Sequence, residues 1–335
     1  MLFQVADQAV VQGTAVLQEI KVQATKNGKS QYASGVLVTP DEKVPVKIWD
    51  VDDTINQLNN HVVDFTAQRN DYNGQLQFVV QKLAANEQAS IRDYLPSSYW
   101  SRQEVAAGFK HFLGKITDPL YHQVVNACYK QVDQEITDPL FDMPAAVKMH
   151  HAFIGGLYTH TLSMAYEAEG ILAHTIYRQD INESLLYAGI LLHDLGKAYC
   201  YTNATDHEET RAGSLLDHVA IMDGMLVEQF EKILQVPYGD LLKNEKVTLL
   251  RHMILSHHGK LEWGAAIKPA TLEAQLLHQV DLADSRLEMA RETLDQQAPD
   301  TFSDRQFGLD GARLYKETPI RPQSQTTDTD SRPAE

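Results

Sequence analysis

The sequence has few cysteines and lacks both a long apolar run and a signal-peptide pattern. Those features, where present, would indicate a disulfide-stabilised, a membrane or a secreted protein. The chain has only two cysteines, Cys128 and Cys200, in 335 residues, which is too few for a disulfide framework. No apolar run reaches the roughly 18 residues needed to cross a bilayer, and the first residues lack the pattern of a signal peptide. We therefore expect a cytoplasmic protein without a membrane span, in which any metal site uses histidine and aspartate rather than thiolates.

A basic excess is also missing, because the net charge is −16. Proteins that contact nucleic-acid phosphates usually carry such an excess, so the charge argues weakly against a nucleic-acid partner. A site rich in aspartate, however, needs a cation before it can approach a phosphate. The acidic balance is therefore compatible with a metal site.

The first 90 residues alternate short apolar runs with turn signals. Asn27-Gly28 and Asn73-Gly74 are strong hairpin signals, and a short helix is expected near residues 54–60. Five short strands in this length predict a small β-barrel, for which an OB-fold is the natural candidate. The runs typical of strands cover residues 10–25, 32–38, 44–49, 62–68 and 75–80.

After the predicted barrel, the apolar pattern changes to the 3.6-residue period of helices. Ser101 and Glu104 have the spacing of a helix start, and Asp118-Pro119 and Asp138-Pro139 predict two more, with proline at the first helical position. Helices are expected to about Tyr315, and the polar residues after it predict a disordered tail. The expected fold is multidomain α+β, with an OB-fold at 1–90, a helical connector at 91–145, an all-α domain at 146–316 and the tail at 317–335.

Histidine is concentrated in one part of the chain, where eleven of the fourteen lie between residues 150 and 278. Several of them interrupt apolar stretches that should be buried, as do two aspartates. A buried neutral polar group costs about 2–7 kcal/mol unless it is paired or bound. Imidazoles mixed with carboxylates are ligands of divalent transition metals. We therefore predict metal ligands among His160, His193, Asp194, His218, His257, His258 and Asp281, without choosing between His257 and His258.

Four residues near this set are weaker candidates. His151 is a candidate for substrate contact, although a role in the helix start or the core is as well supported. Asp284 follows Asp281 by one turn and either accepts a hydrogen bond from a ligand or is an exposed helix acid. His252 and His278 also lie within a turn or so of predicted ligands and are candidates for supporting them.

The barrel carries aromatic residues on which bases of a single strand could stack. We single out Tyr32, Trp49 and Tyr72 as candidates for this contact. For each of them core packing is the better prediction. Acidic residues outnumber basic ones in residues 1–90, so charge does not favour nucleic-acid binding there.

The order of the polar residues resembles the HD-domain metal-dependent phosphohydrolases over roughly residues 146–290. His160 is followed about thirty residues later by His193-Asp194, then by further histidines and an aspartate. The resemblance implies a first metal held by His160, His193, Asp194 and Asp281. It also implies that Asp194 bridges to a second metal, which His218 and either His257 or His258 complete. Lys197 belongs to the matching His-Asp-x-Gly-Lys motif, lies one turn after Asp194 and could reach a phosphate oxygen.

Two longer segments resemble the YhaM family of 3′–5′ exoribonucleases. They are FDMPAAVKMHHAFIGGLYTHTL at 141–162 and LSHHGKLEWG at 255–264. That family carries an OB-fold ahead of its HD domain, which is the order predicted here. The resemblance implies metal-dependent hydrolysis of the 3′-terminal phosphodiester of single-stranded RNA, or of single-stranded DNA, to nucleoside 5′-monophosphates. It favours two Mn²⁺ ions, with Fe²⁺ or Co²⁺ as alternatives, and leaves the oligomeric state open, a homo-oligomer included.

Two other functions stay open on the sequence. An HD phosphohydrolase that acts on a small nucleotide would use the same metals and leave the barrel regulatory, so deletion of residues 1–90 would not change its rate. A non-catalytic single-strand-binding protein would still bind after the substitution Asp194→Ala. An exonuclease would lose affinity or processivity when residues 1–90 are deleted. It would lose its rate of hydrolysis with Asp194→Ala.

Overall fold

The computed structural model describes residues 5–25, 28, 30–40, 42–70, 76–147, 151–205, 208–295 and 297–318. The chain divides into two compact units, residues 1–284 and 285–335. Tyr72, the Asn73-Gly74 turn and most of the predicted tail lie outside the described residues. No described helix combines the length and the apolar character that a membrane-crossing segment needs.

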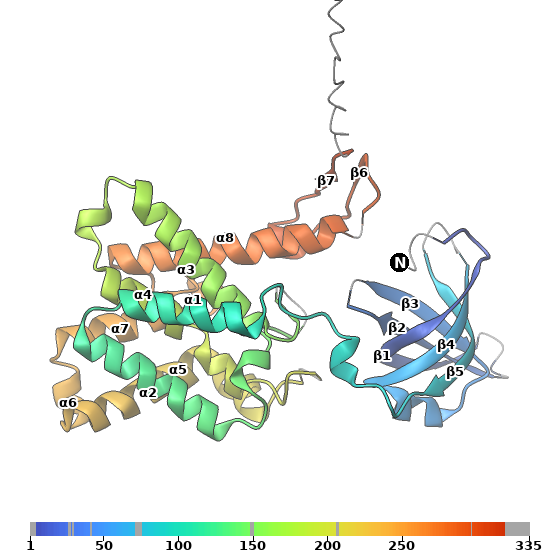
Figure 1. Cartoon of the computed structure of the whole chain (residues 1–335), viewed down its shortest axis with the longest axis horizontal. Coiled ribbons are helices and arrows are strands. Elements are labelled where there is room, and N and C mark those ends of the chain that lie inside the picture. Colours follow the sequence, from blue (N-terminus) through green and yellow to red (C-terminus); the bar gives the residue numbers. More distant parts are fainter. Residues whose placement is uncertain are drawn as a thin grey trace, which may run out of the picture. The chain divides into compact units, whose positions relative to one another are not determined.

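The first strands form a closed barrel with the order β1-β2-β3-β5-β4 (Figure 1). Neighbouring strands are antiparallel except β3 and β5, which are parallel. A closed five-stranded barrel of this kind is OB-like, as the sequence predicted. The strands are β1 (Val10–Ala24), β2 (Gln31–Val38), β3 (Lys43–Trp49), β4 (His61–Arg69) and β5 (Phe78–Ala85).

β1 closes the barrel because it bends. It pairs with β4 along its first half and with β2 along its second half, with a register shift between Gln18 and Lys21. Glu19 has a positive φ of 55° at this shift, which is typical of a β-bulge. The helix expected near 54–60 is a short 3₁₀ helix at Asp53–Leu58.

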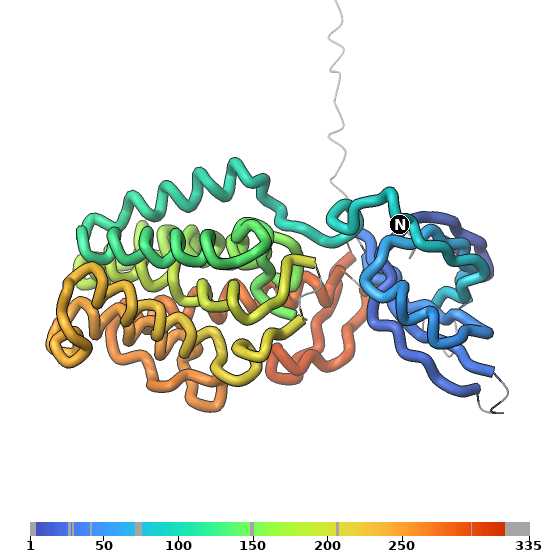
Figure 2. Tube along the Cα trace, turned by 90° about the horizontal axis from the view of Figure 1, so that it is seen from below, coloured from blue at the N-terminus to red at the C-terminus, as the bar shows by residue number. Residues whose placement is uncertain are grey.

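The helical part begins where the sequence predicted it to begin. Ser101 and Glu104 form a reciprocal capping box, and the Asp118 side chain accepts two backbone N–H bonds ahead of Pro119. Figures 1 and 2 show α1 to α5 and α7 packed side by side. The helices are α1 (Arg102–Lys115), α2 (Pro119–Glu135), α3 (Gly156–His174), α4 (Glu183–Leu192), α5 (Arg211–Leu234), α6 (Tyr238–Leu241), α7 (Glu245–Ser256) and α8 (Leu272–Asp295).

α4 is the central helix of this part and contacts α1, α2, α3 and α7. Every residue of α4 after Glu183 is buried, because its sequence ESLLYAGILL is apolar on all faces. The helix ends directly at His193-Asp194. A helix buried on all sides therefore carries this polar pair into the interior of the helical part.

Two sequence predictions for this part were wrong. Asp138-Pro139 starts only a 3₁₀ turn, Leu140–Asp142, because the Asp138 carboxylate instead accepts hydrogen bonds from Arg92 and the backbone N–H of Ala204. The helices also end before Tyr315. After α8, residues around Pro299 lead into a small hairpin of β6 (Thr301–Phe302) and β7 (Tyr315–Lys316).

Candidate metal centre

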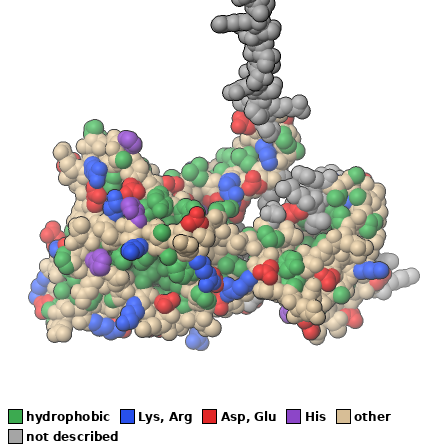
Figure 3. All heavy atoms as spheres, viewed as in Figure 1, with side chains coloured by type: hydrophobic (Ala, Val, Ile, Leu, Met, Phe, Trp, Pro, Cys, Tyr) green, Lys and Arg blue, Asp and Glu red, His purple; other side chains and the backbone are tan. Residues whose placement is uncertain are grey.

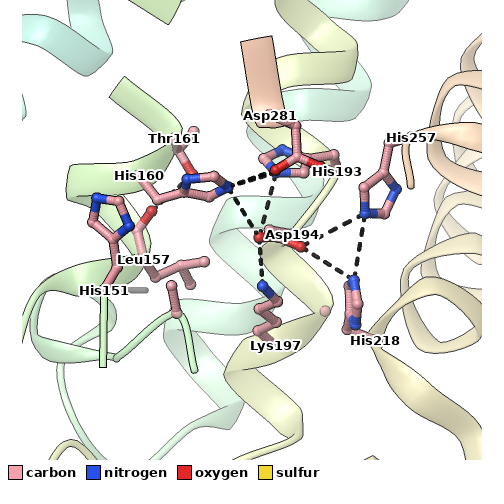
Figure 4. Close-up of polar contacts among 12 residues, drawn as sticks. His151, Leu157, His160, Thr161, His193, Asp194, Lys197, His218, His257 and Asp281 are labelled. Carbon is pink, nitrogen blue, oxygen red and sulfur yellow. Dashed lines mark hydrogen bonds and ion pairs between the residues drawn. The ribbon is translucent and has the colours of Figure 1, made fainter. Parts of the chain in front are cut away.

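Polar side chains from separate helices converge inside the helical part (Figure 4). They come from α3, the end of α4, α5, the end of α7 and α8, which are distant in sequence. His160 and His193 have no exposed side-chain surface, and Asp281 has 17%. The structure brings together all the predicted ligands, namely His160, His193, Asp194, His218, His257, His258 and Asp281.

Asp194 lies between two groups of imidazoles, as Figure 4 shows. Its Oδ2 atom is 3.3 Å from His193 Nε2 and 3.5 Å from His160 Nε2. Its Oδ1 atom is 3.1 Å from His218 Nε2 and 3.8 Å from His257 Nε2. One carboxylate that faces two groups of nitrogen ligands has the arrangement of a bridging ligand between two ions.

Each group contains three donors that could share one ion. The donor atoms of each group lie within 4.8 Å of one another. Around Oδ2 of Asp194 these donors come from His160, His193 and Asp281, and the group near Oδ1 is His218, His257 and His258.

Two buried polar atoms at the centre fit a role as cation ligands. In the part of the chain that the structure describes, Asp194 Oδ1 and His258 Nδ1 are buried and have no hydrogen-bond partner. Buried polar atoms normally have one, so these two call for a specific explanation. Imidazole nitrogens and carboxylate oxygens are ligands that suit Mn²⁺, Fe²⁺ and Co²⁺. The residues present therefore fit a pair of divalent ions.

Backbone carbonyls determine which ring nitrogen faces the centre in two of the histidines. His193 Nδ1 donates to the Ile190 carbonyl at 2.8 Å, and His257 Nδ1 donates to the Ile254 carbonyl at 2.7 Å. Each histidine follows the last residue of a helix and reaches back one turn. With Nδ1 bonded to the backbone, the Nε2 atom of each ring faces Asp194 and is the nitrogen that can bind a metal.

Carboxylates orient two more of the histidines, His160 and His218. His160 Nδ1 donates to Asp284 Oδ2 at 2.6 Å, so Asp284 is buried at the site and is not an exposed helix acid. His218 Nδ1 contacts Asp217 in the same way. Partners of this kind hold the ring and raise its basicity towards a metal.

Asp217 is a residue that sequence reasoning missed. Its backbone is left-handed, with φ 64° and ψ 155°, and it interrupts α5 just before His218. A residue other than glycine in such a conformation costs about 1–3 kcal/mol, and this strain is common at functional sites. No local pattern predicted the interruption, because Asp217 lies within an otherwise helical segment.

Opposite charges at the centre offset the free-energy cost of burying each of them. Burial opposes the ionised form of Asp194, but Lys197 and His193 outweigh it and hold the pKa of Asp194 well below its usual value. Lys197 Nζ lies 2.7 Å from Asp194 Oδ2. Burial also opposes charge on His160, but hydrogen bonds to Asp281 and Asp284 raise the pKa of His160 to about 10.

The glycine of the His-Asp-x-Gly-Lys motif has a packing role. The α-helix ends before Asp194, and Lys197 lies on a 3₁₀ helix, Leu195–Tyr199, rather than on a continuation of α4. A Cβ atom on Gly196 would lie 2.4 Å from the carbonyl oxygen of His218. Glycine therefore allows the 3₁₀ helix and α5 to approach closely enough for Asp194 to meet His218.

We expect Gly196→Ala to push α5 away, lowering the free energy of unfolding by about 1–3 kcal/mol and weakening metal binding at the group that contains His218. Thermal unfolding and the Mn²⁺ content per chain measure both effects. Gly224→Ala is the matched control on α5, because nothing lies within 4 Å of its Cβ position. Better helix propensity should make that variant more stable, by about 1 kcal/mol. Identical behaviour of the two variants would contradict the packing role of Gly196.

The three weaker histidine candidates differ in what they contact. His151 is buried, with Nε2 3.5 Å from Asp284 Oδ2. His278 Nδ1 donates to the carbonyl of His257 at 2.9 Å, so it holds the backbone of a candidate ligand. His252 Nε2 instead accepts from the backbone N–H of Ala270 at 2.9 Å, in the segment that follows α7.

On the barrel, Tyr32 and Trp49 are cross-strand partners on β2 and β3. Their ring centroids are 5.1 Å apart, and Lys47 Nζ lies 5.7 and 6.0 Å from the two rings. Trp49 is 47% exposed and Tyr32 is half-buried, and neither belongs to the hydrophobic core of the barrel. The core packing favoured by the sequence is therefore wrong for these two residues.

Comparison with known proteins agrees with this arrangement. Residues 157–286 match the family model of the HD domain. A protein of Oceanobacillus iheyensis named 3′-5′ exoribonuclease YhaM is 30% identical over 312 residues, which cover 91% of this chain and 93% of that protein. The chain belongs to the YhaM family. YhaM proteins of Listeria monocytogenes and of a Geobacillus species are also 30% identical, over 90% and 87% of this chain and 94% and 86% of their own lengths. The family resemblance drawn from the sequence is therefore confirmed.

Proposed function

We propose that this protein removes nucleotides from the 3′ end of single-stranded RNA by metal-dependent hydrolysis. The observation that supports it most is the Asp194 carboxylate, which lies between two groups of imidazoles. The YhaM relatives are named 3′-5′ exoribonucleases, and this name is the basis for proposing RNA as the substrate and the 3′ end as the starting point. Single-stranded DNA, which has the same phosphodiester, is a second substrate to test.

The two groups of donors divide the candidate ligands. His160, His193 and Asp281 would hold one ion, His218 with His257 or His258 the other, and Asp194 would contact both. Mn²⁺ is the ion we favour, with Fe²⁺ and Co²⁺ as alternatives. When bound, such ions polarise a phosphate and lower the pKa of water.

The hydrolysis releases nucleoside 5′-monophosphates. A bond forms between a water oxygen and phosphorus, and the bond from phosphorus to the 3′ oxygen of the preceding nucleotide breaks. That oxygen takes up a proton, so the RNA keeps a free 3′ hydroxyl for the next round. Lys197, which Asp194 keeps protonated, would stabilise negative charge on a phosphate oxygen.

The barrel would hold the strand upstream of the cleaved bond. Figure 3 shows acidic and basic side chains interspersed on the visible face, and the net charge of −16 gives no general attraction for RNA. Affinity would therefore depend on local contacts. The ring pair of Tyr32 and Trp49, with Lys47 beside it, offers stacking surface and one positive charge.

The test is a 5′-labelled single-stranded RNA incubated with the protein and Mn²⁺, with and without chelator, and resolved on a sequencing gel. We expect a ladder that shortens from the 3′ end, stops with chelator and resumes when Mn²⁺ is restored in excess. RNA that stays intact with Mn²⁺ present would contradict the proposal. In that case small phosphodiesters would be the next substrates for the same site.

A further inference from the structure

The segment between α7 and α8 begins at the candidate metal ligands and carries exposed apolar side chains. It follows His257-His258 and includes Leu261, which is 56% exposed, and Trp263, which is 38% exposed. Exposed large apolar side chains gathered in one place are typical of a binding surface. The segment therefore has the character of a binding surface.

Glycines at both ends of the turn from residue 259 to residue 264 lie close to histidines at the metal centre. Gly259 has a φ of 77°, and a Cβ atom there would lie 2.2 Å from the ring of His278. Gly264 has a φ of 93°, and a Cβ atom there would lie 3.4 Å from Nδ1 of His258. The turn that carries Trp263 therefore packs directly on a candidate ligand and on the histidine that holds the backbone of His257.

Trp263 lies close to a helix turn that carries a partly exposed residue of the centre. Its ring centroid is 6.2 Å from that of His278, which precedes Asp281 by three residues on α8. The Asp281 side chain is 17% exposed, whereas those of His160 and His193 have no exposed surface. Asp281 is therefore one of the partly exposed residues of the centre, and Trp263 lies beside His278, one turn before Asp281 on α8.

Lys260 is placed over the Trp263 ring, with Nζ 3.9 Å from the centroid. A lysine over an indole ring is a weak contact at an exposed position, so a base could replace it on the ring. The released ammonium group would then be next to the incoming strand. An aromatic ring with an adjacent cation is the combination that binds single-stranded nucleic acid.

We propose that the base of the 3′-terminal nucleotide stacks on Trp263 while its phosphodiester lies at the metal centre, and that Lys260 contacts a phosphate of the same strand. The inference rests on the proposed exonuclease function and names a substrate-positioning residue for it. Stacking accepts every base, because each base has an aromatic face. Such a contact would let the site hold each new 3′ end in turn, whatever its sequence.

The test compares two RNAs that differ only in the last residue, which is a normal nucleotide in one and an abasic residue in the other. For Trp263→Ala we expect kcat/KM on the normal RNA to fall roughly 10- to 100-fold, mainly through KM. On the abasic RNA the same variant should match the wild type. Trp263→Phe should keep most of the activity. Tyr177→Ala is the matched control, because Tyr177 is 59% exposed beyond the opposite end of α3 from His160.

Binding in the presence of chelator gives a second measurement that does not need activity. Trp263 is one of three tryptophans, and the normal RNA should quench the fluorescence of the wild type more than that of Trp263→Phe. The abasic RNA should remove this difference. Equal quenching, or an equal loss of kcat/KM on both RNAs in Trp263→Ala, would overturn the inference while the exonuclease function stands. If the wild type shortens neither RNA, the proposed function fails and the inference fails with it.

Discussion

Replacing Asp194 by asparagine is expected to lower the rate of RNA shortening on the order of 10³-fold. The two oxygens of Asp194 face two groups of imidazoles, and an amide would offer one oxygen and no charge. Because the side chains are alike in size, we expect the fold to be kept. Gel assays of 5′-labelled RNA measure the rate, and mass spectrometry of the purified protein measures its metal content, which should fall below that of the wild type.

Asp118→Asn is the control for this substitution. Asp118 is also a partly buried carboxylate that pairs with a lysine, Lys246, but it caps α2 and lies outside the candidate ligands. We expect this variant to lose some stability and to keep its metal content and its rate per folded molecule. If Asp194→Asn retained both ions and a normal rate, Asp194 would not be a bridging ligand.

Removing both rings of the barrel pair is expected to weaken binding of long single-stranded RNA roughly 100-fold, because each stacked base contributes about 1–3 kcal/mol. The double variant Tyr32→Ala with Trp49→Ala should raise KM for a long RNA and leave kcat unchanged. A dinucleotide, which offers one phosphodiester to the metal centre and has no upstream strand for the barrel to bind, should be cleaved as by the wild type. Initial rates over a range of RNA concentrations measure both quantities.

The double variant also has a matched control. Gln31→Ala changes an exposed residue beside Tyr32 on β2 and removes no ring, so KM for the long RNA should stay the same. An equal loss of activity on the dinucleotide and on the long RNA would mean that the two rings act on the metal centre or on folding. The stacking role would then be rejected.

Much of the fold was predictable because its signals are local. In β3, Val44, Val46 and Ile48 are buried between more exposed neighbours, which is the alternation read from the sequence. The capping box of Ser101 and Glu104 forms as predicted, since both partners lie within four residues. Asp138-Pro139 failed as a helix start because distant groups, Arg92 and the Ala204 N–H, bind the capping carboxylate.

The sequence by itself determined the family and the set of polar residues gathered at the centre. A histidine or aspartate within an apolar run must find a partner when it is buried, so His160, His193-Asp194 and Asp281 were expected to meet. The tertiary structure alone decided that Asp194 presents one oxygen to each group and that Asp217 orients His218. These contacts join helices that are distant in sequence, and the packing of those helices determines their distances.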